Sequence, residues 1–206
     1  MGTQESGRDV YKPGKQKVIK LKLMDELVVT QTKKWITDVV IGCNFCPFAA
    51  NEVRLDAIRY VVERSNDLNR CLQIIIREFI VMDSDESVAT TLIIFPDSFE
   101  NFDDYLDLVS LAEALLEKEG YEGVYQVASF HPKYLFAGSD DSDAANFTNR
   151  SVYPMLHILR ESQVERALKK YPGAAKIPGT NIKFAQELGL DKMKMLRNAC
   201  FAVKTG

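Results

Sequence analysis

The sequence is poor in several features, and each absence argues against a class of protein. Its formal net charge is −3, which leaves no excess of basic residues, so we expect no nucleic-acid partner. No stretch approaches the roughly 20 apolar residues that cross a bilayer, so we expect no membrane partner either. The first residues lack the apolar segment of a signal peptide, and we therefore expect a cytoplasmic protein.

Cysteine is also scarce. The four cysteines are Cys43, Cys46, Cys71 and Cys200. A disulfide framework is not expected in a cytosolic chain of 206 residues, so each cysteine needs its own explanation. Cys71 falls on the apolar side of a predicted helix, where a thiol acts as a small hydrophobic group. Cys43 and Cys46 have the spacing of a redox pair, but they follow a helix end, where the dipole raises the pKa of a thiol.

The hydrophobic pattern predicts alternating helices and strands. Apolar residues at helical spacing indicate helices over residues 27–41, 67–82 and about 101–119. Apolar and β-branched runs indicate strands over residues 58–62, 89–95 and 123–130. We therefore expect a layered α/β domain with a small sheet of three or four strands flanked by helices. A ferredoxin-like α+β arrangement is the alternative.

The remaining segments complete this outline. Gly42 stands where a left-handed residue would end the first helix. A helix from Pro154 to about residue 171 follows a long polar loop, and another is expected over residues 180–188. We expect residues 1–23 to be a flexible basic leader, residues 24–190 a single domain and residues 191–206 a tail, in which the residues past Leu190 form either a short helix or a loose segment.

Both histidines of the chain lie within 27 residues of each other, around the long loop. His131 follows a predicted strand, and ligands of open α/β sheets bind beyond the carboxyl ends of strands. His157 falls in the first turn of the helix predicted from Pro154, where the helix dipole favours a neutral imidazole. Arg150 and Asn149 precede this helix, and Arg160 shares its face with His157. The residues therefore indicate an anion site at the start of that helix.

Cys46 is the third candidate for this site, and three interpretations stay open. It could be a nucleophile that uses His131 or His157 as its base. It could bind a metal ion together with both histidines, although the Cys-His spacing matches no structural zinc site. It could also be a thiol buried beneath the loop. The residues assign no metal and no cofactor.

Three segments of the chain resemble a bacterial family known only as domain of unknown function number fourteen-fifteen. They are WITDVVIGCNFCPFA, QVASFHPKYLFAG and DAANFTNRSVYPMLHILRE, and the resemblance runs from about Leu27 to Leu188. It implies no activity and no cofactor. It adds Tyr134, Asn146 and Tyr153 to the candidate binding residues, because they match the motif of the family.

The chain also departs from the family pattern at two positions. Cys43 stands where relatives are expected to have an apolar residue, which further weakens the redox-pair interpretation. Val152 stands where the pattern has proline. The other matching motif residues are Cys46, Pro47, Phe48, His131, Pro132, Phe136, Asn149, Arg150, Pro154, His157 and Arg160.

We expect from these observations an enzyme that acts on a small anionic molecule, either a carboxylate or a phosphate. Cys46, His131 and His157 would carry the chemistry, while Arg150, Arg160 and Asn149 would hold the anion. One alternative is a non-catalytic module that binds an anion or an acidic peptide. Another is a metal-dependent hydrolase that uses two His and one Cys. The residues assign neither a substrate nor an oligomeric state.

Overall fold

A four-stranded mixed sheet organises the part of the chain that the structure describes. This computed structural model describes residues 13–171 and 173–203, with side chains from residue 16 onward. The strands are β1 (Ile58–Val62), β2 (Thr90–Ile94), β3 (Tyr125–Phe130) and β4 (Met155–Arg160). They lie in the order β1-β2-β4-β3. β1 and β2 are parallel, whereas β4 runs antiparallel to both β2 and β3.

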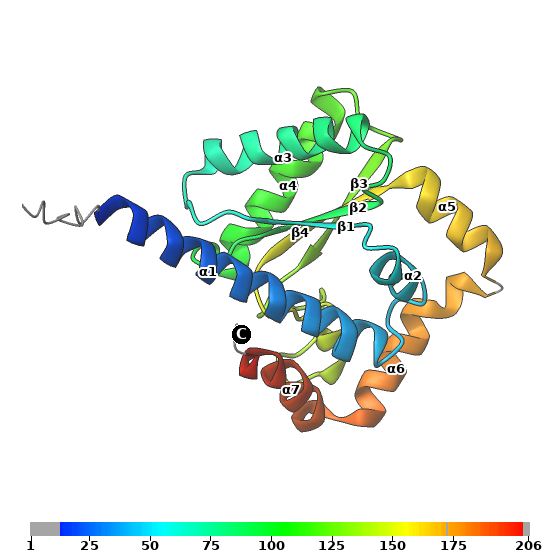
Figure 1. The fold of residues 1–206 in the computed structure, drawn as a ribbon. Coiled ribbons are helices and arrows are strands. Elements are labelled where there is room, and N and C mark those ends of the chain that lie inside the picture. The colour runs from blue at the N-terminus through cyan, green and yellow to red at the C-terminus, as the bar shows by residue number, and fades with distance from the viewer. Residues whose placement is uncertain (1–12, 172, 204–206) are drawn as a thin grey trace, which may run out of the picture.

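Two long helices cover one face of this sheet (Figure 1). α3 (Leu68–Ser84) begins after Asp67 and α4 (Phe102–Lys118) begins after Asn101. Both of these side chains accept hydrogen bonds from amides of the first helical turn, which have no partner inside a helix. The core on this face includes Ile75, Phe79, Ile93, Leu108, Leu156 and Ile158.

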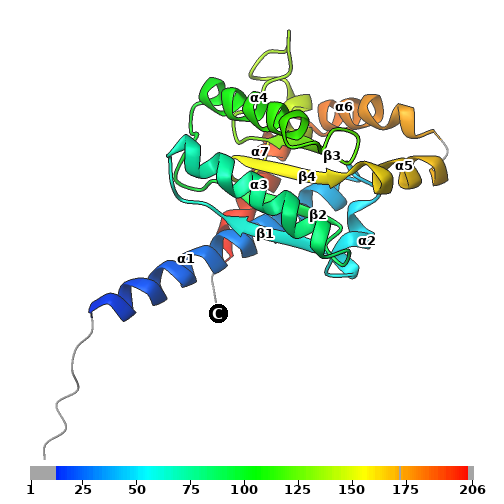
Figure 2. The same cartoon turned by 90° about the horizontal axis from the view of Figure 1, so that it is seen from above.

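Helices from both ends of the described chain cover the opposite face (Figures 1 and 2). They are α1 (Pro13–Trp35), which continues as a π-helix (Ile36–Ile41), α6 (Ile177–Leu188) and α7 (Leu190–Ala199). The second core includes Trp35, Val39, Phe147, Met155, Met193 and Cys200. Since both faces are covered, every residue of β2 is buried.

The shorter elements lie around these two layers. α2 (Ala49–Arg54) and α5 (Glu161–Lys170) lie near one end of the sheet (Figure 1). The 3₁₀ turns are Ala144–Thr148, Ala174–Lys176 and Cys200–Ala202. The layered α/β architecture that the sequence predicts is confirmed. The chain order β1-α3-β2-α4-β3-β4 differs from the β-α-β-β-α-β order of ferredoxin-like domains, so that alternative does not apply.

The helix predicted from Pro154 to residue 171 is wrong in its first part. Residues Met155–Arg160 form strand β4, and a helix starts only at Glu161. β4 lies between β2 and β3 and is covered on both faces, so its apolar residues are nearly continuous in sequence. Such a run satisfies helical spacing as well as strand spacing, and periodicity alone does not separate the two.

The end of the first helix also differs from the prediction. Gly42 has a φ of −59°, which is right-handed, and its amide donates to the carbonyl oxygen of Thr37 at 3.0 Å. A Cβ atom at this position would lie 2.2 Å from the carbonyl oxygen of Asp38. Glycine is therefore needed here because backbone groups approach closely, and not because φ is positive.

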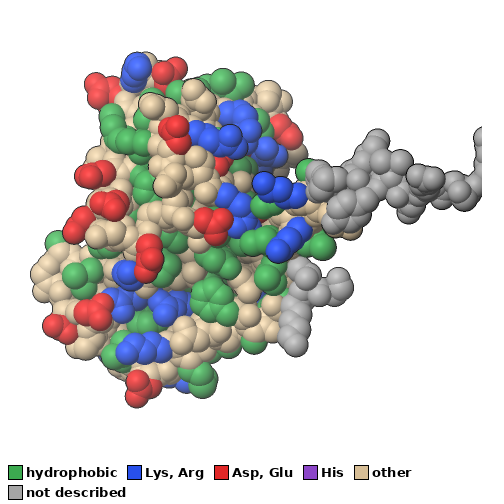
Figure 3. All heavy atoms as spheres, turned by 90° about the vertical axis from the view of Figure 1, so that its left-hand side faces the viewer, with side chains coloured by type: hydrophobic (Ala, Val, Ile, Leu, Met, Phe, Trp, Pro, Cys, Tyr) green, Lys and Arg blue, Asp and Glu red, His purple; other side chains and the backbone are tan. Residues whose placement is uncertain are grey.

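The two ends of the described chain differ from the predicted leader and tail. Residues 13–23 already belong to α1, while residues 1–12 of the predicted leader lie outside the described residues. Val18 and Ile19 are more than half exposed there, and Figure 3 shows hydrophobic and basic side chains intermixed near α1. The predicted tail contains α7, whose Met193 is fully buried, and Cys200 in the 3₁₀ turn after it is fully buried too. Within the described ranges, no helix has the length and apolarity of a membrane-spanning segment.

Candidate functional site

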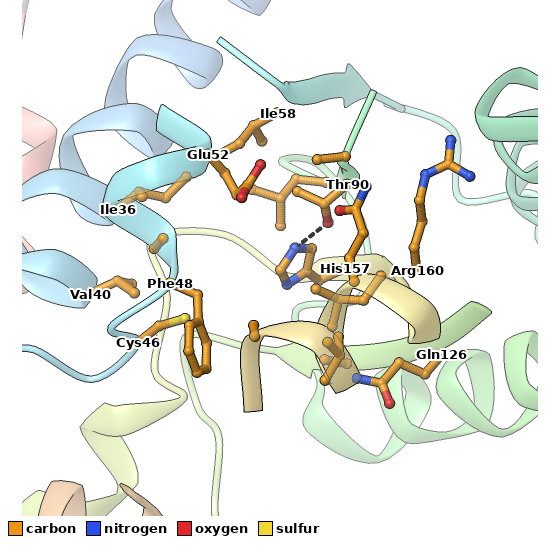
Figure 4. A pocket seen from close by; sticks show the side chains of 18 of the residues that line it. Ile36, Val40, Cys46, Phe48, Glu52, Ile58, Thr90, Gln126, His157 and Arg160 are labelled. Atoms are coloured by element: carbon orange, nitrogen blue, oxygen red, sulfur yellow. Dashed lines mark hydrogen bonds between the residues drawn. The ribbon is translucent and has the colours of Figure 1, made fainter. Parts of the chain in front are cut away.

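A cavity of about 320 Å³ lies against the second face of the sheet (Figure 4). Helices α2 and α5 and the π-helix line it opposite the strands. Its apolar walls include Trp35, Ile36, Phe48, Ile58, Leu92 and Phe130. Its polar side chains include Cys46, Glu52, Thr90, Gln126, His157 and Arg160. This volume and this mixture of many apolar and few polar groups are typical of small-molecule sites.

The π-helix contributes to the wall of this cavity. It extends α1 by Ile36–Ile41, and both Ile36 and Val40 line the cavity beside Trp35. Such wider turns often occur at functional sites. After Gly42 the chain turns, and Pro47 prevents the helix from continuing. The short helix α2 then begins at Ala49 and brings Glu52 to the cavity.

Among the polar side chains of the cavity, His157 is the one whose hydrogen bonds define which ring nitrogen carries the proton. It lies on β4 opposite Leu92 of β2, so both side chains point to the same face of the sheet. The hydroxyl group of Thr90 donates to the carbonyl oxygen of Ile158 at 2.6 Å. That hydroxyl is therefore free to accept from Nε2–H of His157, also at 2.6 Å. This pair leaves Nδ1 of His157 as an acceptor.

The charge state of His157 follows from its surroundings. Burial removes water from the ring and lowers its pKa to about 4, so the imidazole is neutral near pH 7. Nδ1 has no hydrogen-bond partner among the described residues and faces the side of the cavity that holds Phe48 (Figure 4). The sequence predicts a neutral imidazole because of a helix dipole. In the structure His157 lies on a strand, and desolvation lowers the pKa of its ring instead.

Cys46 borders the same cavity. It is a free thiol and is partly exposed, whereas Cys43, Cys71 and Cys200 are free and buried. Burial raises the pKa of Cys43, which disfavours a thiolate at that position. No hydrogen bond joins Cys46 to His157, although both side chains line the cavity (Figure 4). The structure therefore brings together two of the three residues predicted to carry the chemistry.

His131 lies on the other face of the sheet. Ala128 is paired with His157, so the alternating residues Tyr125, Val127 and Ser129 point away from the cavity, and His131 continues that series. Nδ1 of His131 accepts from the Lys133 amide at 3.0 Å, and Nε2 therefore carries the proton that it donates to the Phe99 carbonyl at 2.8 Å. Both ring nitrogens are occupied, and burial lowers the pKa of the ring.

Arg150 binds the long loop itself instead of an open pocket. It is 5% exposed. Its Nε donates to the Tyr134 carbonyl at 2.9 Å, and Nη2 donates to Asp141 Oδ1 at 2.6 Å. Asn146, which is fully buried, accepts from the Phe136 amide and so bridges the same loop. Their polar groups are used in holding the loop.

Arg160 lines the cavity, but its guanidinium group points away from it (Figure 4). Nη2 donates to the carbonyl oxygens of Met82 and Asp85 at the end of α3. Nε donates to the carbonyl oxygen of Val88 at 3.1 Å. The cation therefore satisfies carbonyl groups at a helix C-terminus, as basic side chains often do. Its aliphatic part forms the cavity wall.

The remaining predicted residues are also engaged within the protein. The side chain of Asn149 donates to the Ser129 carbonyl at 3.5 Å. The Tyr153 hydroxyl donates to the side chain of Gln31 on α1. The Tyr134 ring packs against the rings of Phe102 and Phe136. Asn149 and the two arginines are not assembled into one anion pocket.

Several cavity residues were not predicted from the sequence. Thr90 had a usable signal, because a buried run of ATTLIIF places hydroxyl groups where they need partners. Trp35 is the single tryptophan and directly precedes the π-helix, and its buried indole N–H has no partner among the described residues. No sequence pattern indicates that Glu52 lines the cavity, because its place there depends on how α2 packs against the sheet.

The predicted metal ligands do not form a set. Within residues 13–171 and 173–203, no group of three or more His, Cys, Asp or Glu side chains is arranged to hold a metal ion. His131 and His157 lie on opposite faces of the sheet, so they could not share an ion with Cys46.

Comparisons with known proteins identify a family but no characterised relative. No curated protein and no solved structure matches the chain. The family model described as "Protein of unknown function (DUF1415)" matches residues 27–195, which include the sheet, the cavity and the long loop. The chain therefore belongs to the DUF1415 family.

Proposed function

We propose that this domain binds a small, largely apolar molecule in the cavity and places a hydrogen-bond donor of that molecule against Nδ1 of His157. The apolar walls would bind the body of the ligand through the hydrophobic effect. His157 would fix its orientation, since a few placed polar groups give such sites their specificity. The cytoplasmic location expected from the sequence stays a prediction.

One observation carries this proposal: the neutral imidazole of His157 has an acceptor nitrogen that has no partner among the described residues and borders a largely apolar cavity. His157 is only half-buried and Nδ1 is not among the fully enclosed polar atoms, so a ligand donor can reach this acceptor from the cavity. The pKa of about 4 also supports binding over proton transfer. A catalytic base works best when its pKa is near the working pH.

The test compares two aromatic probes of similar size, benzyl alcohol and toluene, by ligand-observed NMR on the full chain. We expect benzyl alcohol to bind more tightly, and His157→Leu to remove its advantage while toluene still binds. The leucine keeps an apolar wall and removes the acceptor. Failure of both probes to bind, or equal binding of both to the native protein, would refute the proposal.

A second candidate function is the enzyme predicted from the sequence, with Cys46 as nucleophile. It is favoured by one observation, namely that Cys46 is the partly exposed thiol of the four and lines the cavity with His157. If His157 activates it, iodoacetamide should alkylate Cys46 at pH 7 at least tenfold more slowly in the His157→Leu variant. A Cys46 thiol that stays unreactive even at pH 9 would reject this function.

A further inference from the structure

A carboxylate on the cavity wall has no cationic partner in the part of the chain that the structure describes. Glu52 lies on α2, is partly buried and directs its carboxylate toward Thr90 and His157 (Figure 4). One hydrogen bond is made to it, from the side-chain amide of Asn51 to Oε1 at 3.0 Å. No Lys, Arg or His of the described chain lies within 4.0 Å of it as an ion pair, so it has no salt-bridge partner among those residues.

The nearby basic groups do not take this role. Arg160 lines the same cavity, but its guanidinium group donates to carbonyl oxygens at the end of α3. His157 is neutral and presents an acceptor toward the cavity. Glu52 and His157 therefore border one largely apolar space with two acceptor atoms, Oε2 and Nδ1, that receive no hydrogen bond from the described residues.

The aromatic residues of the cavity add a second preference for positive charge. Trp35, Phe48 and Phe130 line the space that Glu52 and His157 border. The face of an aromatic ring is negative, so it attracts a cation, and the attraction is larger away from water. An anionic ligand would instead meet a carboxylate and aromatic side chains.

We propose that the ligand is an organic amine, whose ammonium group binds the Glu52 carboxylate. Its apolar part fills the space between the aromatic side chains and the sheet. This inference rests on the binding function proposed above and names the class of ligand. The charge of that ligand is opposite to the charge expected from the sequence, because Arg150 and Arg160 are used within the protein.

The experiment measures the affinities of benzylamine, benzyl alcohol and benzoate for the full chain at pH 7.5 and low ionic strength. These probes share one ring and differ in charge. We expect benzylamine to bind at least tenfold more tightly than benzyl alcohol, and benzoate to bind most weakly. Glu52→Gln should remove the advantage of benzylamine and leave the affinity for benzyl alcohol within twofold.

A charge-matched control separates this local effect from the net charge of the protein. Glu86 is exposed and lies outside the cavity, so Glu86→Gln should preserve the preference for benzylamine. If benzyl alcohol binds but benzylamine has no advantage, or if both variants reduce it equally, the amine inference is overturned and the binding function stands. If none of the three probes binds, the binding function itself fails.

Discussion

At the scale of single residues, the two histidines differ in what their ring nitrogens can still bind. His131 uses one nitrogen as donor and the other as acceptor, and both partners are backbone groups. His157 uses one nitrogen with Thr90 and presents the other to the cavity. Both are neutral because burial disfavours the charged ring, but only His157 keeps a group for a ligand among the described residues.

The lowered pKa of the half-buried His157 predicts a pH dependence of stability. Its pKa falls from 6.5 in the unfolded chain to about 4 in the folded protein. Between these values the unfolded state binds more protons, so the free energy of unfolding should decrease by about 3 kcal/mol as the pH falls through this window. Urea denaturation of the native protein and of His157→Gln at pH 7, 5.5 and 4.5 measures this.

The glutamine variant should lose most of that dependence, because its side chain does not titrate and can still donate to Thr90. Part of the dependence of the unfolding free energy on pH should remain in the variant, since burial also lowers the pKa of His131. The carboxyl groups of Asp85, Asp140 and Asp143 have lowered pKa values and contribute only at more acidic pH. Parallel curves for the two proteins would contradict the assignment of His157 as a buried neutral ring.

Arg150 provides a second prediction at this scale. Arg150→Met should reduce the free energy of unfolding by about 2–4 kcal/mol, because the loop loses hydrogen bonds to a largely buried cation. Arg166→Met is the matched control, since Arg166 is exposed, and its effect should stay within about 0.5 kcal/mol. Thermal and urea unfolding measure both. Equal, small effects would indicate that Arg150 does not hold the loop.

At the scale of elements, α7 belongs to the folded core. Met193 is fully buried on this helix, whereas Met195 is 52% exposed. Met193→Ala should therefore cost about 2–4 kcal/mol of stability through lost burial and a residual cavity. Met195→Ala on the same helix should change stability by less than about 0.5 kcal/mol. Similar values from urea unfolding would mean that residues 190–199 are a loosely attached tail.

The π-helical end of α1 gives a second test at this scale. It compares two glycines whose replacement by alanine should change the stability of the protein in opposite directions. A Cβ at Gly42 would meet the Asp38 carbonyl oxygen at 2.2 Å, so Gly42→Ala should destabilise the protein by about 2 kcal/mol or more. Gly179 lies in α6 with open space around its missing side chain. Gly179→Ala should stabilise by up to about 1 kcal/mol, because alanine favours a helix. Thermal unfolding that gives both variants the same sign would contradict the tight approach at Gly42.

At the scale of the whole molecule, one sheet joins two cores. Leu156 and Ile158 of β4 pack under α3 and α4, while Met155 of the same strand packs under α1, α6 and α7. Neighbouring residues of one strand thus contribute to both faces. We expect the two layers to unfold together, because separating either one exposes the sheet that the other needs.

The fluorescence of the single tryptophan allows the joint unfolding of the two layers to be measured. Trp35 lies in the second core, and Leu108 lies in the first on the far side of the sheet. Leu108→Ala should shift the unfolding midpoint seen by Trp35 fluorescence as far as the midpoint seen by circular dichroism. Leu106→Ala on the same helix is the control, since Leu106 is 40% exposed. A Trp35 transition that stays unchanged in Leu108→Ala would mean that the layers unfold separately.

The sequence by itself determined the elements whose evidence is local. Capping residues and amphipathic spacing were sufficient for α3, α4 and the strands β1, β2 and β3, since these signals act within one element. The family resemblance was also accessible from the sequence, and so was the placement of Cys46 and His157 near one another. The strand β4 was missed because a strand buried on both faces lacks the alternation that identifies strands.

The tertiary structure alone decided what the candidate residues do. Strand pairing places His131 and His157 on opposite faces, and this depends on register between strands distant in sequence. Arg150 and Arg160 resemble an anion site in sequence, yet backbone carbonyl groups and Asp141 bind them in the folded chain. Glu52 reaches the cavity only because α2 packs against the sheet. Sequence patterns show which groups are present, whereas packing decides which of them stay without a partner and remain open to a ligand.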